Sequence, residues 1–419
     1  MKDKTKKILI PIAITLGVAA VFFIGFFTRE LTYSKTQRAL LNIIDKYEKY
    51  YYYESDDVID IISDAIFDKY SYYMTKEEYQ AVKKEAGGDQ QGIGLSFYSG
   101  SLKIVGVVTN SPCDKAGVEA GGVIEKIEVN GQDKPFTDYN SFIDVLDGVS
   151  IGGSVKLTIN YDGEVKSYSV VKSEYKRSYV TYRDSSGTYN FIDSGGMNLT
   201  LDSAISIQTP NTAYIKYEKF SGKSSGNNGS IGQLKTALSK FADGGNKNLI
   251  LDIRNNGGGA MEILSEVAGL FVEKQGNNQV VAISKDKYDK EKLFYVKNNV
   301  SSVYGIEKLI VLANQNTASA SEAFIGALLD YDLQNKVTVV LDGYEENGEV
   351  KYKTFGKGIM QTTYTNLDGS AVKVTTAKLY WPKTQTIIHS VGITEATSPK
   401  VKNAVNGDAY EYAINMLNN

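Results

Sequence analysis

Between residues 213 and 341 the chain alternates short apolar runs with amphipathic segments, and this alternation constrains the fold more than any other feature. Apolar runs that read as strands occupy 213–217, 248–253, 309–313 and 337–341, and helical patterns occupy 231–241, 261–272 and 321–329. Buried strands that alternate with helices are typical of a sheet with parallel crossovers. Residues 213–400 are therefore predicted to form an α/β domain.

The N-terminus has the pattern of a membrane anchor. Four lysines among residues 1–7 precede an uncharged run from Ile8 to Phe27. As a helix, a run of about 20 residues matches a hydrocarbon core of roughly 30 Å, and it is longer than the apolar region of a cleavable signal peptide. We expect residues 1–7 to be a cytoplasmic basic tail and 8–27 a signal anchor that crosses the cell membrane once. The residues after Phe27 would then lie outside the cytoplasm; a cleaved signal peptide is the alternative.

Further regions flank the α/β domain. Apolar residues from Val58 to Ile66 recur at helical spacing, so residues 28–86 are expected to be a helical collar. Residues 87–173 change to short β-rich runs that are broken by Gly and Asp turns. Residues 174–212 are interpreted as a linker with hairpin pieces, and 401–419 as a C-terminal helix.

Composition narrows the chemistry. The chain contains one Cys, Cys113, and one His, His389, and its 46 Lys+Arg against 49 Asp+Glu leave a formal net charge of −3. Zinc sites built from several Cys or His ligands cannot be assembled from this inventory, and a nucleic-acid partner is not expected. We predict no metal and no cofactor, and we interpret Cys113 as structural.

Two turns between a strand and a helix, 252–259 and 314–322, are candidate sites for chemistry. A serine at a helix N-terminus is a candidate nucleophile because neighbouring N–H groups can stabilise an oxyanion, although serine is also an ordinary N-cap. His389 lies far along the chain, so Lys357, between two glycines, is the better candidate base. A lysine acts as a base if burial lowers its pKa from about 10.4 toward neutrality; a surface turn is the alternative.

The order of turns in residues 87–173 resembles that of a PDZ domain. The turns are Gly92-Ile93-Gly94-Leu95, Ser111 to Gly117, Gly121 to Ile124, and Val129-Asn130-Gly131. The resemblance implies that Gly92, Ile93, Gly94 and Leu95 form a loop whose backbone N–H groups bind the free C-terminus of a peptide. A PDZ fold that serves only as a spacer is the alternative.

The α/β region resembles the carboxyl-terminal processing proteases of the S41 type. Three motifs carry the resemblance: Asp252 to Gly259, Thr317-Ala318-Ser319-Ala320-Ser321-Glu322, and Phe355-Gly356-Lys357-Gly358 followed by Gln361. The likeness extends from about Ser55 to Ile393 and implies a multidomain α/β protein with a crotonase/ClpP-like protease core. Two departures stand out. Asn-Gly-Gly-Gly replaces the commoner Asn-Pro-Gly-Gly, and extra residues between Ser319 and Lys357 map to 344–352, a predicted hairpin with an Asn-Gly turn.

The resemblance also implies roles for individual residues. Ser319 would be the nucleophile, Lys357 its general base and Gln361 the residue that orients the lysine. Oxyanion donors would be the backbone N–H groups of Ala320 and of Gly258 or Gly259. Ser321 is the rival nucleophile, Arg254 is expected to structure its turn, and Asp330 is expected to anchor the helix that follows Ser319.

The function implied is that of a membrane-anchored serine endopeptidase. It would recognise protein C-terminal tails through its PDZ domain and cleave them outside the cytoplasm. Its partner would be a protein or peptide with a free C-terminus, and assembly into a homo-oligomer stays open. The alternatives are a catalytically silent peptide-binding scaffold and an acyl-thioester enzyme of the related crotonase-like folds.

Overall fold

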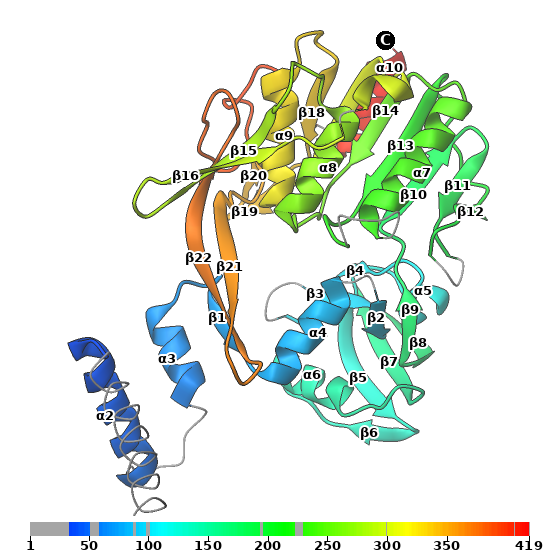
Figure 1. The fold of residues 1–419 in the computed structure, drawn as a ribbon. Coiled ribbons are helices and arrows are strands. Elements are labelled where there is room, and N and C mark those ends of the chain that lie inside the picture. The colour runs from blue at the N-terminus through cyan, green and yellow to red at the C-terminus, as the bar shows by residue number, and fades with distance from the viewer. Residues whose placement is uncertain are drawn as a thin grey trace, which may run out of the picture. The chain divides into compact units, whose positions relative to one another are not determined.

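The computed structural model describes residues 33–50, 58–86, 89–97, 101–192, 196–222, 229–298, 300–405 and 407–418 (Figure 1). The chain divides into two compact units, Met1–Tyr73 and Met74–Asn419. The expected anchor at 8–27 lies outside the described residues. Among the residues that are described, no helix has the length and apolar character needed to cross a membrane.

The first unit contains two helices, α2 (Lys35–Tyr50) and α3 (Val58–Ile66). Strand β1 (Tyr72–Met74) follows at the boundary, and α4 (Lys76–Ala86) belongs to the second unit. A helical collar from 28 to 86 was therefore too simple a prediction, because a strand interrupts it and the unit boundary divides it.

The β-rich region of the second unit has its own apolar core. Strand β2 (Asp89–Gly92) pairs with β9 (Ser173–Lys176), and β3 (Leu95–Phe97) pairs with β4 (Ile104–Val107). A four-stranded sheet has the order β6-β5-β7-β8, with bounds Gln132–Lys134, Val123–Val129, Ser154–Tyr161 and Glu164–Val171. Two helices complete it, α5 (Pro112–Lys115) and α6 (Tyr139–Asp147), and the second of these starts at a capping box formed by Asp138 and Ser141.

Cys113 belongs to the core of this region and has no solvent exposure. Burial raises the pKa of its thiol to about 12. A thiol with so high a pKa is a poor nucleophile at neutral pH. The structural interpretation of Cys113 is confirmed.

The α/β region is built on an eight-stranded sheet with the order β12-β11-β10-β13-β14-β17-β18-β23. Its strands are β10 (Val180–Asp184), β11 (Gly187–Asn190), β12 (Thr200–Ser203), β13 (Thr212–Tyr217), β14 (Asn248–Asp252), β17 (Lys308–Ala313), β18 (Val337–Leu341) and β23 (Val401–Asn403). The five from β13 to β23 run parallel. The predicted parallel sheet is confirmed.

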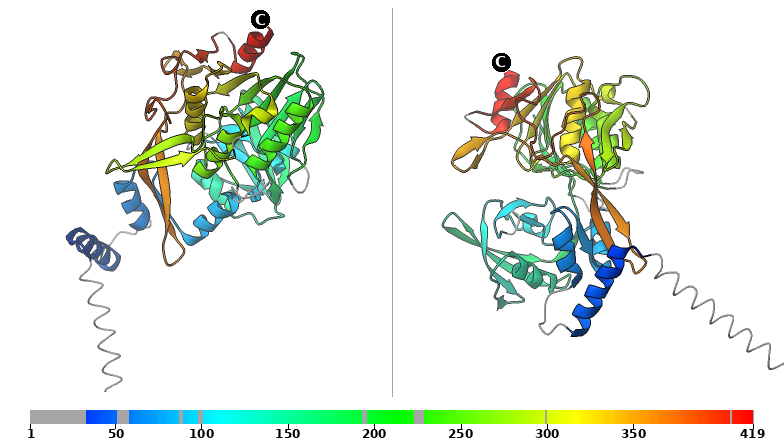
Figure 2. Two further views of the ribbon diagram at one scale, coloured as in Figure 1. Left: turned by 45° about the horizontal axis from the view of Figure 1, so that its top comes forward. Right: turned by 90° about the vertical axis from the view of Figure 1, so that its left-hand side faces the viewer.

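Helices cover both faces of this sheet (Figures 1 and 2). Alternate residues such as Leu249 and Leu251 pack with α7 (Ser230–Asp243), α8 (Met261–Phe271) and α9 (Ala320–Tyr331) in one core. Ile250 faces the other way and packs with α10 (Ala409–Asn418). Strands buried on both faces read as continuous apolar runs, which is why the sequence pattern located them.

Two boundary predictions were wrong. The expected linker at 174–212 supplies β10, β11 and β12 to the large sheet, and Tyr179, Tyr182 and Phe191 are fully buried in its core. The polar turn from Asp184 to Gly187, which suggested a linker, is the bend between the antiparallel strands β10 and β11. The C-terminal helix begins at Ala409, because residues 401–403 form β23 instead.

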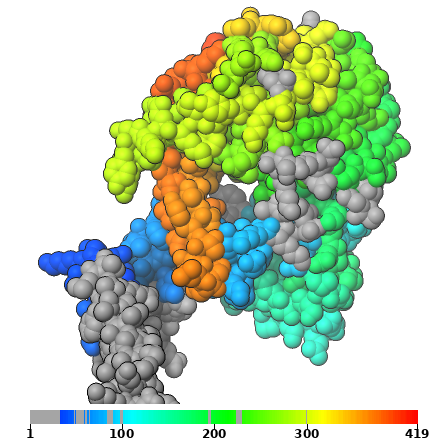
Figure 3. Space-filling model, in the orientation of Figure 1, coloured from blue at the N-terminus to red at the C-terminus, as the bar shows by residue number. Residues whose placement is uncertain are grey.

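A second sheet carries two antiparallel hairpins. Strands β15 (Val280–Asp286) and β16 (Glu291–Tyr295) form one hairpin, and β21 (Ile359–Thr365) and β22 (Ala371–Tyr380) form the other, with β15 pairing to β22. Both hairpins are visible on the surface in Figure 3, in yellow-green and orange. The predicted hairpin at 344–352 is confirmed as β19 (Tyr344–Glu346) and β20 (Glu349–Lys351), with positive φ at Asn347 and Gly348 in its turn.

Candidate active site

A pocket of about 760 Å³ lies at the carboxyl ends of the parallel strands. It is lined by the turns that follow β13, β14 and β17 and by parts of the two hairpins. The sequence-predicted residues that line it are Ser319, Lys357, Gln361, Gly258 and Gly259. Ala320 is fully buried directly behind Ser319. Carboxyl strand ends are the usual position of ligand sites in open α/β sheets.

Ser319 occupies a strained turn at the N-terminus of α9. Its φ of 60° and ψ of −117° place a non-glycine residue in a sparsely populated region of the backbone map. The rival Ser321 is fully buried, and its hydroxyl donates to the Asn256 carbonyl at 2.9 Å. Of the two serines, the pocket is lined by Ser319 and not by Ser321.

The glycine turn after β14 packs directly against the Ser319 turn. A Cβ at Gly258, whose φ is +93°, would lie 2.7 Å from both the Ala318 oxygen and the Ala320 nitrogen. Only glycine therefore permits this approach. The N–H of Gly258 donates to Asn256 Oδ1 at 2.9 Å. Within the described turns, the N–H groups of Gly259 and Ala320 donate to no backbone carbonyl.

The loop that carries Lys357 is also shaped by close contacts. A Cβ at Gly356 would lie 2.9 Å from the Gly392 nitrogen, and one at Gly358 would lie 2.7 Å from the His389 nitrogen. The loop is tied to the nucleophile turn by the Phe355 N–H, which donates to the Thr317 carbonyl at 3.0 Å. The two glycines thus give Lys357 a defined position rather than a flexible one. His389 itself does not line the pocket.

Glu322 links the serine turn to the lysine loop, a role that sequence reasoning missed. Its side chain has no solvent exposure. One oxygen accepts from the backbone N–H groups of Ser319 and Lys357, each at 2.9 Å, and the other accepts from Gly356 N at 2.8 Å and from the Thr354 hydroxyl. Burial raises the pKa of Glu322, and these hydrogen bonds oppose that rise. The available signal was Glu three residues after Ser319, which is the spacing of a capping box.

Gln361 lies where β21 bulges. The register between β21 and β22 shifts between Met360 and Gln361. The Gln361 amide donates to Thr375 Oγ1 at 3.3 Å, and its side chain lines the same pocket as Lys357. A bulge re-aims the side chain at this point of the strand. The orienting role of Gln361 stays a prediction.

Arg254 ties the strand ends together behind the pocket. Its guanidinium lies 2.6 Å from Asp252, the last residue of β14, and 2.8 Å from Asp342, which follows β18. The Tyr214 hydroxyl donates to the same Asp252 carboxylate at 2.8 Å. The prediction that Arg254 structures its turn is confirmed.

Asp330 ties α9 to a neighbouring turn, as expected of a residue that anchors this helix. Near the C-terminal end of α9, its carboxylate accepts hydrogen bonds from the N–H groups of Lys383 and Thr384 at 2.8 and 3.1 Å. Asp330 therefore holds the turn after Trp381 against α9.

The predicted carboxylate loop, Gly92, Ile93, Gly94 and Leu95, lies between β2 and β3. A Cβ at Gly94 would lie 2.1 Å from Ser111 Cβ, so the loop requires glycine there. The carbonyls of Ile93 and Gly94 accept from the N–H groups of Cys113 and Val108, each at 2.9 Å. Among the strands that the structure describes, β3 pairs only with β4. The binding role of this loop stays a prediction.

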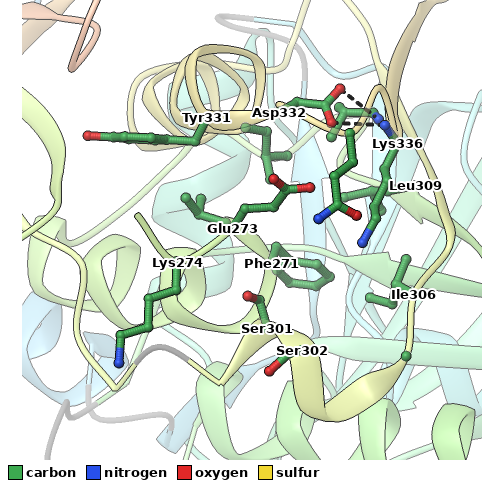
Figure 4. Close-up of a pocket in the computed structure, with 15 residues that line it drawn as sticks. Phe271, Glu273, Lys274, Ser301, Ser302, Ile306, Leu309, Tyr331, Asp332 and Lys336 are labelled. Carbon is green, nitrogen blue, oxygen red and sulfur yellow. Dashed lines mark hydrogen bonds between the residues drawn. The ribbon is translucent and has the colours of Figure 1, made fainter. Parts of the chain in front are cut away.

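A separate pocket of about 380 Å³ lies where β17 and β18 begin (Figure 4). Phe271, Leu309 and Val337 line it together with polar side chains that include Glu273 and Lys336. It contains none of the predicted catalytic residues. The pocket at the opposite strand ends is therefore the candidate active site.

Comparison with known proteins places this geometry in context. The model of Peptidase family S41 matches residues 211–397. A probable CtpA-like serine protease of Staphylococcus saprophyticus is 29% identical over 80% of this chain and 58% of its own length. One from Staphylococcus aureus strain N315 is 28% identical over 92% of this chain and 70% of its own. The chain thus spans less than two thirds of the first of these relatives.

The fold has a counterpart of known structure. The photosystem II D1 C-terminal processing protease matches with a TM-score of 0.51 and 22% identity, over 90% of this chain and 91% of its own. The structural likeness, at 22% identity, shows a shared fold. Residues 211–397 accordingly match the model of peptidase family S41, within a chain that is similar over most of its length to CtpA-like serine proteases.

Proposed function

We propose that this protein is a serine endopeptidase with Ser319 as nucleophile and Lys357 as general base. One observation carries the proposal: a serine in a strained helix-terminal turn lines the same pocket as a lysine fixed between two packed glycines. A nucleophile and a base that share a pocket are the minimum for acyl transfer.

The proposed reaction begins with attack of Ser319 Oγ on the carbonyl carbon of a peptide bond. The neutral amine of Lys357 takes the hydroxyl proton and later gives it to the departing amine. The N–H groups of Ala320 and Gly259 would donate to the oxyanion, because the N–H of Gly258 already donates to Asn256 Oδ1. Water then attacks the acyl carbon and Lys357 accepts its proton; the bond to Ser319 Oγ breaks, the proton passes from Lys357 to Oγ, and the product leaves with a new C-terminal carboxyl group. Glu322 would hold the serine turn and the lysine loop in register through its bonds to both backbones.

The test is hydrolysis of a flexible protein with an apolar tail. Ser319→Ala and Lys357→Ala should each lower kcat by at least about a thousandfold, as expected of residues that act as one unit. Ser321→Ala is the matched control, since its hydroxyl is buried and bonded away from the pocket, and its kcat should stay close to wild type. Circular dichroism checks that each variant is folded. Near wild-type turnover by folded Lys357→Ala would contradict the mechanism, and loss of wild-type activity on metal chelation would indicate another enzyme class.

The β-rich region is proposed to capture the C-terminal tail of the substrate. The glycine loop at 92–95 and the edge position of β3 support strand addition by an extended peptide. In the full chain with Ser319→Ala, a peptide with a free C-terminus should bind more tightly than its amidated form. Equal affinity for the two peptides would show that the region does not capture C-terminal tails and serves only as a spacer. If the wild-type protein binds tails but does not hydrolyse them, it is instead the catalytically silent scaffold.

Residues 8–27 are proposed to anchor the chain in the cell membrane with the domains outside the cytoplasm. Support comes from the uncharged run behind four lysines. The full-length protein should stay in the membrane fraction after carbonate washing, and external protease should digest its folded domains in right-side-out preparations. If the mature protein lacks residues 8–27, they are a cleaved signal peptide and not an anchor.

A further inference from the structure

The pocket of about 380 Å³ where β17 and β18 begin has an apolar floor and a polar rim (Figure 4). Exposed polar residues such as Ser302 and Gln334 lie at its rim. The floor is formed by four side chains that are each at most 8% exposed: Phe271, Leu309, Leu328 and Val337. Pockets that bind small molecules are mostly apolar and of this volume or larger. This pocket therefore has the size and the surface to hold the apolar body of a small organic molecule.

The carboxylate of Glu273 lies in the same pocket (Figure 4). Its Oε1 is buried and accepts a hydrogen bond from no residue that the structure describes. Lys274 and Lys336 also line the pocket, but neither donates to this oxygen. A buried carboxylate oxygen without a donor costs free energy, and a charged donor offsets that cost best. Glu273 is therefore suited to a cationic group supplied by a ligand.

The other carboxylate of the described lining, Asp332, is already satisfied by the protein. It accepts from the backbone N–H groups of Lys336 and Val337 at 2.8 and 3.0 Å. It also forms an ion pair with Lys400 at 2.6 Å. Asp332 thus has donors for both oxygens, and Glu273 is the acidic group that can interact with a ligand.

Two helices end at this pocket and add to its preference for a cation. Helix α8 ends at Phe271 and α9 at Tyr331, and both residues line the pocket. Neither helix has a basic residue in its last turn. The C-terminal end of a helix carries partial negative charge, which favours cations. Lys274 follows α8 closely, but in Figure 4 its ammonium group points away from Glu273.

We propose that this pocket binds a small organic cation, in which a primary ammonium group is attached to an apolar body. The ammonium group donates to Glu273 Oε1, and the apolar body packs on the floor that includes Phe271 and Leu309. The pocket contains none of the proposed catalytic residues. The inference is therefore independent of the proposed peptidase function.

The test measures the affinity of the full chain for a series of small compounds by saturation-transfer NMR titration. Phenethylamine carries the cation, 2-phenylethanol is its neutral counterpart and 3-phenylpropionate its anionic one. Phenethylamine should bind with a Kd of about 1 mM, the scale for a ligand of this size. The alcohol should bind about tenfold more weakly, because it forms no charge-assisted hydrogen bond of this kind. Ethylamine, which lacks the phenyl ring, should also bind at least about tenfold more weakly.

A charge variant assigns the binding to one residue. Glu273→Gln should lower the affinity for phenethylamine about tenfold and leave the affinity for 2-phenylethanol unchanged. Glu307→Gln is the matched control, because Glu307 is exposed, pairs with Lys247 at 3.2 Å and does not line the pocket, although it follows Ile306 of the lining. Its affinities should equal those of the wild type. Circular dichroism checks that both variants are folded.

The compound series and the variants each provide a result that would overturn the inference. Equal affinity of the wild type for phenethylamine and 2-phenylethanol would show that the pocket has no cation site. Phenethylamine binding that survives Glu273→Gln would place the ligand elsewhere. Tighter binding of 3-phenylpropionate than of phenethylamine would show that the lysines of the lining select an anion instead.

Discussion

Two regions meet around the candidate active site, and they are built on opposite principles. The turns at the strand ends, 252–259 and 314–322, are buried, rich in glycine and cross-linked by hydrogen bonds such as that from Ala318 N to the Asn256 carbonyl at 3.1 Å. In the hairpins β15–β16 and β21–β22, exposure is confined mainly to β16 and the end of β21, whereas β15 and β22 are mostly buried or half-buried. Reacting groups need positions held within fractions of an ångström. We therefore expect substitutions in the turns to change turnover more than substitutions in the hairpins.

The largest effect should come from adding a single methyl group to the turns. Gly258→Ala would place a Cβ 2.7 Å from the Ala318 oxygen and the Ala320 nitrogen, at a φ of +93°. Because the neighbours are backbone atoms, the Ser319 turn must move, and we expect kcat to fall at least about a hundredfold. Stability should fall by about 2 kcal/mol or more, measured by chemical denaturation.

Gly257→Ala is the control for this change. No atom lies within 4 Å of a Cβ built there, and its φ is not positive. It should keep kcat and stability close to wild type. Equal losses in the two variants would show that the turn is generally fragile and that the contact with Ser319 is unimportant.

A smaller effect is expected from removing the charge of Glu322 while keeping its shape. Its carboxylate accepts four hydrogen bonds, two at each oxygen. In Glu322→Gln the amide NH₂ would face two donors, which costs about 1–3 kcal/mol of unfolding free energy. Because both turns are tied to this carboxylate, kcat should fall by about tenfold to a hundredfold with little change in KM.

Glu262→Gln provides the comparison for Glu322, since Glu262 is exposed at the start of α8. Its unfolding free energy should stay within about 0.5 kcal/mol of wild type. Urea denaturation measures both variants. A Glu322→Gln protein as stable as Glu262→Gln would show that the buried carboxylate does not organise the site.

Gln361 lies at the border between the two regions, on a hairpin strand but in the pocket. Gln361→Ala should lower kcat by a few fold to about tenfold, as expected for a residue that orients a base without reacting itself. Thr375→Val removes the hydroxyl that holds Gln361 and should have a weaker effect of the same kind. If neither change alters the pH dependence of kcat, Gln361 does not act through Lys357.

The smallest effect is predicted for the extra hairpin, β19–β20. Its turn residues Asn347 and Gly348 have φ values of 54° and 80°. Gly348→Ala meets no atom within 4 Å, so its cost is the local strain of a positive φ, about 1 kcal/mol. Turnover of a short peptide should not change. A clear loss of kcat would show that this insertion helps to position Lys357.

Sequence reasoning located the strands and helices of the α/β domain because each buried strand is a continuous apolar run between turn residues. It failed in the region of β10 to β12, where Tyr182 on β10 and Phe191, just after β11, enter the core and a polar bend joins the two strands. Short polar turns read as a linker when no partner strand is known. Pairing with β13 supplied that partner, and pairing is a long-range property.

The sequence by itself determined which residue types are available and where the turns fall: one histidine, a serine after the third strand of the parallel run, and a lysine between glycines. Tertiary structure decided which of them meet. The Ser321 hydroxyl is buried and donates to the Asn256 carbonyl, and Gly258 packs against the Ser319 turn. Glu322 forms hydrogen bonds to residues that are 32 or more positions away in the chain. These outcomes depend on burial and on hydrogen-bond geometry between distant segments. Local sequence patterns do not contain that information, because contact between remote segments arises only when the sheet assembles.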